Sequence, residues 1–139
     1  MVFTQSTDGG LTWSPLTRID KSGDAAAFVP SLAVASDGTV GATYYDFRNN
    51  TPAPGLPTDQ WFVHCHPSAT SSCTNPANWI ESHVYGPFDL ENAATSGTAF
   101  FLGDYEGLAT IGTTFTPFFS APTPTDPDNT YLATLTPSP

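Results

Sequence analysis

Basic side chains are scarce in this sequence. Three Lys and Arg residues stand against thirteen Asp and Glu, which gives a formal net charge of −10. Nucleic-acid binding needs Lys and Arg to neutralise phosphates, and anionic membranes attract basic segments for the same reason. We therefore expect neither a nucleic acid nor a membrane as partner. Acidity can attract cations, although a solvated acidic surface explains it equally well.

Long apolar runs and helical periodicity are also lacking. No stretch reaches transmembrane length, and the opening residues MVFTQS have neither the basic region nor the apolar run of a signal peptide. Fourteen Pro and eleven Gly among 139 residues leave little room for long helices. Ten Phe, five Tyr and three Trp supply enough apolar surface for a core. We expect an all-β domain.

Runs rich in β-branched and aromatic residues alternate with turn signals along the whole chain. Asp37-Gly38 between two such runs predicts a hairpin, because glycine accepts a positive φ without steric cost. The predicted strands cover residues 1–5, 11–19, 28–35, 39–47, 60–66, 79–88, 100–112, 113–121 and 130–137.

One spacing occurs twice. Ser6 precedes Trp13 by seven residues, and Ser72 precedes Trp79 by the same interval. The two tryptophans lie about 66 residues apart, and each pair separates two predicted strands. A four-stranded unit repeated at this length is typical of propeller blades. A single β-sandwich, which needs no repeat, is the alternative.

The stretch STDGGLTW matches the Asp-box, Ser-x-Asp-x-Gly-x-x-Trp, at Ser6, Asp8, Gly10 and Trp13. The sequence therefore resembles the bacterial neuraminidase repeats of sialidase-like six-bladed propellers. This resemblance implies an incomplete β-propeller arc of about two and a half four-stranded antiparallel blades. Residues 1–19 would end one blade, 28–88 would form a full blade, and 100–136 would form a partial one.

In that family the Asp-box is a turn between the third and fourth strands of a blade. Asp8 is then expected to accept hydrogen bonds from turn N–H groups, and Gly10 to take a conformation that other residues resist. Trp13 is expected to bury its ring against the sheet. A calcium ligand is the alternative role for Asp8, but one carboxylate is too few for a site. We expect no cofactor and leave only calcium open.

The second box is degenerate, because Thr74 replaces the aspartate and Pro76 the glycine between Ser72 and Trp79. The aspartate clasp is therefore expected to be missing there, and a disulfide between Cys65 and Cys73 is the hypothesis for what holds the turn. Two nearby cysteines in a Lys-poor, Thr/Ser/Pro-rich chain also favour an extracellular location. A zinc site that adds His64 and His66 is disfavoured, because the spacing fits no common finger and neighbouring strand residues face opposite sides.

Strand alternation places several polar residues at the sheet ends opposite the Asp-box, the substrate face in sialidase-like propellers. These are Asp46, Arg48, Asp89, Glu91, Asp104, Tyr105 and Glu106, of which Asp46, Arg48, Asp104, Tyr105 and Glu106 are the catalytic candidates. We expect Asp46 and Arg48 to form a surface pair of little energetic value. Tyr105 and Glu106 are expected to be strand neighbours whose side chains diverge.

A sialidase grips its substrate carboxylate with three arginines, and this chain has only Arg18 and Arg48. We therefore expect a fragment of an extracellular sialidase-like propeller that is not catalytically competent alone. Its parent would hydrolyse or bind glycans, as an exo-sialidase-like glycoside hydrolase if it is an enzyme. The alternative is a non-catalytic scaffold for protein or carbohydrate. Expected partners are a glycan or glycoprotein and the remaining blades, and open sheet edges predict marginal stability or self-association.

Overall fold

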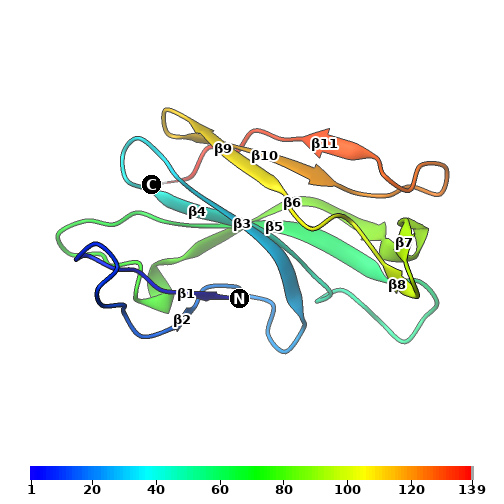
Figure 1. Cartoon of the computed structure of the whole chain (residues 1–139), viewed down its shortest axis with the longest axis horizontal. Coiled ribbons are helices and arrows are strands. Elements are labelled where there is room, and N and C mark those ends of the chain that lie inside the picture. The colour runs from blue at the N-terminus through cyan, green and yellow to red at the C-terminus, as the bar shows by residue number, and fades with distance from the viewer. Residues whose placement is uncertain (139) are drawn as a thin grey trace.

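The computed structural model describes residues 1–138 as an all-β chain with several antiparallel sheets, none of which closes on itself. The largest sheet has four strands in chain order, so each strand pairs with the next through a hairpin or loop. We call it the central sheet (Figure 1). Its strands are β3 (Ala27–Val34), β4 (Val40–Asp46), β5 (Pro57–Cys65) and β6 (Ile80–Asp89).

Smaller sheets flank the central one. The N-terminal pair consists of β1 (Val2–Phe3) and β2 (Thr17–Arg18). The C-terminal sheet has the order β11-β10-β9, with β9 (Gly107–Ile111), β10 (Thr114–Ser120) and β11 (Thr130–Leu132). A short hairpin joins β7 (Thr95–Ser96) to β8 (Ala99–Phe100), and two 3-10 turns, η1 (Pro76–Asn78) and η2 (Leu90–Asn92), complete the described elements. No helix within residues 1–138 has the length and apolarity that a membrane span requires.

The hairpin predicted at Asp37-Gly38 is confirmed. It joins β3 to β4, with Gly38 at φ +86° and the Thr39 N–H donating to Asp37 Oδ1 at 3.0 Å. Glycine suits this position because residues with a Cβ rarely adopt that φ. The local sequence thus determines where the first turn of the central sheet lies.

Both faces of the central sheet are covered, because its inner strands carry apolar side chains on alternate sides. On one face, Tyr44 and Val63 pack with Ile19 beside the N-terminal pair. On the other face, Phe62 contacts Phe115 of β10, with ring centroids 5.1 Å apart. The core is therefore divided into layers, with the central sheet between its two neighbours.

The long strand predicted over 100–112 is wrong in its first half. Gly103 has φ +110°, which interrupts an extended strand, so β9 starts only at Gly107. Tyr105 and Glu106 consequently lie in the connection before β9 rather than within a strand. Their side chains still diverge, since Tyr105 is 91% exposed whereas Glu106 is half-buried.

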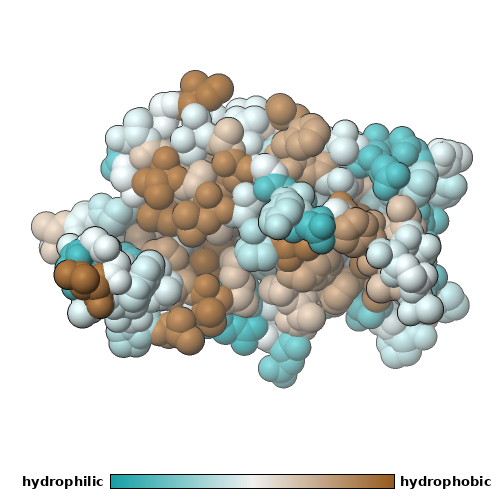
Figure 2. Space-filling model, viewed as in Figure 1, coloured by the Kyte–Doolittle hydropathy of each residue, from teal (hydrophilic) through white to brown (hydrophobic). Residues whose placement is uncertain are grey.

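The turns lie at two ends of the molecule. The β1–β2 connection, the Asp37 hairpin and the loop after β5 lie at the left of Figure 1, whereas β7, β8 and the start of β5 lie at the right. The Thr17 hydroxyl donates to the Thr74 carbonyl at 2.8 Å, which ties two of the left-hand segments together. Figure 2 shows apolar side chains at the surface in the middle of this face, between two ends that are more hydrophilic.

Candidate functional site

The Asp-box residues form a hydrogen-bonded turn at the surface. Asp8 Oδ1 accepts from the Thr12 N–H at 2.9 Å, and the Thr12 hydroxyl donates to Oδ2 at 2.6 Å. Ser6 Oγ donates to Asp8 at 2.7 Å and accepts from the Gly10 N–H at 2.8 Å. The bonds from Thr12 and Ser6 lower the pKa of the Asp8 carboxyl to about 2. Asp8 therefore holds the turn, and its oxygens are already occupied.

The prediction that Trp13 buries its ring is wrong, because the side chain is 62% exposed. The N-terminal pair has only two residues in each strand, so it offers no broad surface to cover an indole. The ring instead lies beside Gly10, 4.0 Å from the position that a Cβ there would take. The motif determines the turn without determining the burial of its tryptophan.

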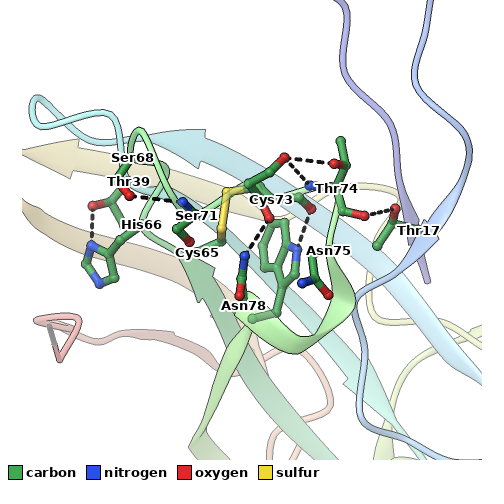
Figure 3. Close-up of a disulfide and its surroundings, with 12 residues drawn as sticks. Thr17, Thr39, Cys65, His66, Ser68, Ser71, Cys73, Thr74, Asn75 and Asn78 are labelled. Carbon is green, nitrogen blue, oxygen red and sulfur yellow. Dashed lines mark hydrogen bonds between the residues drawn. A yellow bond between two sulfur atoms is a disulfide. The ribbon is translucent and has the colours of Figure 1, made fainter.

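The second box keeps part of the same pattern (Figure 3). A disulfide joins Cys65 to Cys73 across the loop. The Ser72 and Thr74 hydroxyls are hydrogen-bonded at 2.7 Å, so Thr74 takes the place that Asp8 has in the first box. The bonds that Asp8 accepts from Thr12 have no counterpart at Thr74, so the aspartate clasp is missing as expected, and the disulfide closes the loop. Trp79 is buried here, and its indole N–H donates to the Cys73 carbonyl at 2.8 Å.

A hollow of about 270 Å³ opens at the opposite end of the sheets, beside the start of β3. Phe28, Val29, Leu90 and residues 100–104 line it, and Asp104 supplies the single carboxylate. Phe100 and Phe101 are about two-fifths exposed, at 41% and 40%. Asp104 was expected at this end of the sheets, and the structure places it in one hollow with Phe28.

Val29 has an unusual backbone conformation in the wall of this hollow. Its φ is +48°, and the register between β3 and β4 shifts between Phe28 and Ser31. A β-branched residue in this region is a genuine outlier and costs of the order of 1–3 kcal/mol. Strain of this kind persists where surrounding structure over-determines it, often beside functional sites. The bulge turns β3 at the point where the hollow forms.

Asp46 and Arg48 do not face the hollow but lie in a buried network against β5 and β6. Arg48 Nε donates to Asp46 Oδ2 at 2.7 Å, and its Nη1 and Nη2 donate to the two Glu81 carboxylate oxygens at 2.5 and 3.0 Å. The guanidinium lies 3.7 Å above the centre of the Trp61 ring, whose N–H donates to Asp46 at 3.0 Å. The predicted surface pair is wrong, because Asp46 is fully buried and the Arg48 side chain is 19% exposed.

Tyr44 completes this network and is shielded from solvent. Its hydroxyl donates to Glu81 and accepts from Arg48 Nη2 at 3.0 Å. Burial, followed by the hydrogen bond to Glu81, raises the pKa of Tyr44 above its ordinary value. Burial opposes the charge of Arg48, but the bonds to Glu81 and Asp46 outweigh it and raise the pKa of Arg48. A fully buried, protonated phenol paired with an engaged carboxylate is a structural unit rather than a nucleophile and its base.

The other candidates are dispersed. Asp89 accepts from the Leu56 and Glu91 N–H groups and so caps η2. Arg18 is paired with Asp20 at 2.7 Å. The roles of Glu81 and Tyr44 could not be predicted from the sequence, because the two side chains meet only through the register of β4, β5 and β6. Each residue alone resembles an ordinary strand position.

Metal ligation finds no support among residues 1–138, where no three His, Cys, Asp or Glu side chains converge to hold an ion. Cys65 and Cys73 are joined to each other, and His64 lies on the opposite face of β5 from Cys65.

No family model matches the chain, and searches of curated proteins and solved structures returned no significant match.

Proposed function

We propose that the chain is a segment of an extracellular sialidase-like propeller that binds a neutral glycan without hydrolysing it. The proposed binding site is the hollow of about 270 Å³ lined by Phe28, Val29, Leu90 and residues 100–104. Aromatic rings in a concave site can stack on the apolar faces of sugar rings, and one carboxylate can accept from sugar hydroxyls. This hollow is the observation that carries the proposal.

The propeller part of the proposal is supported by the Asp-box turn and by the layering of the sheets. Ser6 and Asp8 make the turn bonds expected of the motif. The central sheet is an antiparallel meander covered on both faces, which is what radial stacking of blades requires.

Charge favours a neutral sugar over an anionic one. Both arginines are engaged in ion pairs, Arg18 with Asp20 and Arg48 with Asp46 and Glu81. Asp104 places a negative group at the hollow of a chain whose net charge is −10. A sialic-acid carboxylate would thus meet repulsion and no available guanidinium.

Nuclear magnetic resonance with the full chain tests the site, with lactose and 3′-sialyllactose as the probes. Lactose is expected to shift the amide resonances of residues 28–29 and 100–104, and 3′-sialyllactose to bind more weakly. Phe101→Ala and Asp104→Asn should each weaken the lactose response. Ile111→Ala, which shortens a side chain 77% exposed at the end of β9, is the matched control.

Two results would contradict the proposal. One is a saturating lactose titration that leaves the resonances around the hollow unchanged. The other is release of product from a fluorogenic sialoside at a rate that Asp104→Asn removes, since that would make the hollow catalytic.

A scaffold that binds protein is the second candidate, favoured by the outer face of the C-terminal sheet. Ile111, Phe118 and Leu132 are 77, 53 and 65% exposed there. Clusters of exposed apolar side chains commonly mark association sites. Sedimentation velocity over a concentration series distinguishes this use, because Phe118→Ser should reduce any association while leaving lactose binding unchanged.

A further inference from the structure

Buried polar atoms without a partner gather between the central and C-terminal sheets. Among the described residues, the side-chain atoms in this condition are Thr43 Oγ1, Gln60 Oε1, His64 Nδ1 and Glu106 Oε1. The first three belong to the face of β4 and β5 that the C-terminal sheet covers, and Glu106 immediately precedes β9. An orphaned buried polar atom costs free energy, so a cluster of them calls for a physical explanation.

Two of these atoms belong to side chains that already touch. Gln60 Nε2 donates to Glu106 Oε2 at 2.9 Å, while Gln60 Oε1 and Glu106 Oε1 are left over. Gln60 is fully buried. An ionised carboxylate only accepts hydrogen bonds, and an amide oxygen also only accepts. With Glu106 ionised, neither leftover oxygen can satisfy the other.

We propose that Glu106 is protonated in the folded chain and donates that proton to Gln60 Oε1, closing a two-bond acid–amide pair that locks the C-terminal sheet onto the central sheet. The same proton satisfies both leftover oxygens. It joins β5 to the segment leading into β9, across the boundary between the sheets.

The surroundings of the carboxyl favour this state. Burial raises the pKa of Glu106 to about 7, against the lowering effect of the polar groups around it, of which the Gln60 amide is hydrogen-bonded to the carboxylate. No ionised side chain in the described part of the chain contributes to that shift. Tyr45 from β4 is the neighbouring titratable group, and burial, then Glu106, raises its pKa above the ordinary value. Tyr45 therefore stays protonated while Glu106 titrates.

The lock should open as pH rises. The ordinary pKa of a glutamate is 4.5 and that of folded Glu106 is about 7, so the folded chain holds the proton more tightly than the unfolded chain between these values. Stability from this pair is full below pH 4.5, declines as pH rises and is lost above about pH 7.

Carbon-detected nuclear magnetic resonance of the side-chain carboxyls in the full chain measures the protonation of Glu106 directly. The Glu106 carboxyl is expected to titrate with a midpoint near 7, well above the ordinary glutamate value of 4.5. In parallel, thermal melting is recorded from pH 5 to 8 for the wild type, Glu106→Gln, and the exchanged pair Gln60→Glu/Glu106→Gln. The single variant should lose the decline of melting temperature with pH, and the exchanged pair should restore it.

The carboxyl titration of the wild type tests the proposal even if a variant folds poorly. A Glu106 midpoint at the ordinary glutamate value of 4.5 overturns the proposal. So does a Glu106→Gln variant that keeps the wild-type decline, or an exchanged pair that folds but shows none. None of these measurements uses a sugar, so their outcome is independent of the glycan experiment.

Discussion

Gly41 lies in β4 against Phe115 of the C-terminal sheet, and its replacement by alanine tests how the two sheets are stacked. A Cβ at Gly41 would lie 2.5 Å from Phe115 Cε1 and 2.7 Å from Phe62 Cε2. Both rings are almost fully buried, at 0 and 1% exposure. Neither can therefore move away into solvent, and the sheets must separate or the rings leave their rotamers.

The expected loss follows from two opposing effects. Overpacking a filled core costs about 1–3 kcal/mol. Replacing glycine by alanine in a strand returns about 0.5–1 kcal/mol of backbone entropy. We expect Gly41→Ala to lower the free energy of unfolding by about 1–2 kcal/mol, or about 3–6 °C in Tm for a chain of this size. Urea unfolding followed by circular dichroism measures the change.

Gly107 provides the matched control, because it also lies in a strand but has room. A Cβ there would meet Phe118 Cβ at 3.5 Å, an ordinary contact. Gly107→Ala should therefore be neutral or stabilising. Adding Phe115→Leu to Gly41→Ala should recover part of the loss, giving a favourable coupling in a double-mutant cycle. Equal stability of Gly41→Ala and the wild type would refute the stacking described here.

Three further predictions concern the two boxes. Cys65→Ser/Cys73→Ser should lose about 2.5 kcal/mol in urea unfolding, since the bond closes a loop with a sequence separation of eight; a reduced wild type that is as stable as the oxidised one would contradict this. Because the folded pKa of Asp8 is about 2 against an ordinary 3.8, its contribution to the turn should be full above pH 3.8 and lost as pH falls through about 2. Turn amide resonances should show that transition in the wild type and not in Asp8→Asn. Trp79→Ala should lower the free energy of unfolding by about 3–5 kcal/mol and Trp13→Ala by about 0.5 kcal/mol, because only the Trp79 ring is buried. Similar losses in both variants would show that Trp13 is covered in solution.

What sequence reasoning predicted best was local. The Asp37-Gly38 hairpin and the Asp8 turn depend on residues a few positions apart, and their chemistry admits few alternatives. The Arg48 network could not be predicted in this way. Arg48 and Glu81 meet only because β4, β5 and β6 pair in one register, and a slip of one residue would place these side chains on opposite faces.

The two boxes share their turn hydrogen bonds in part but differ in the burial of their tryptophans. The motif therefore determines the turn, whereas the surrounding structure determines the burial. Ser6 and Ser72 make equivalent hydroxyl contacts two residues on, although one partner is a carboxylate and the other a threonine. Trp13 and Trp79 occupy the same motif position, yet their exposure is 62 and 3%. Turn bonds are satisfied within eight residues, whereas burial of an indole needs a sheet broad enough to cover it. The second tryptophan has the central sheet beside it, and the first has two strands of two residues each. Any surface that packs over the first turn should therefore bury the Trp13 ring and leave the hydrogen bonds of Asp8 unchanged.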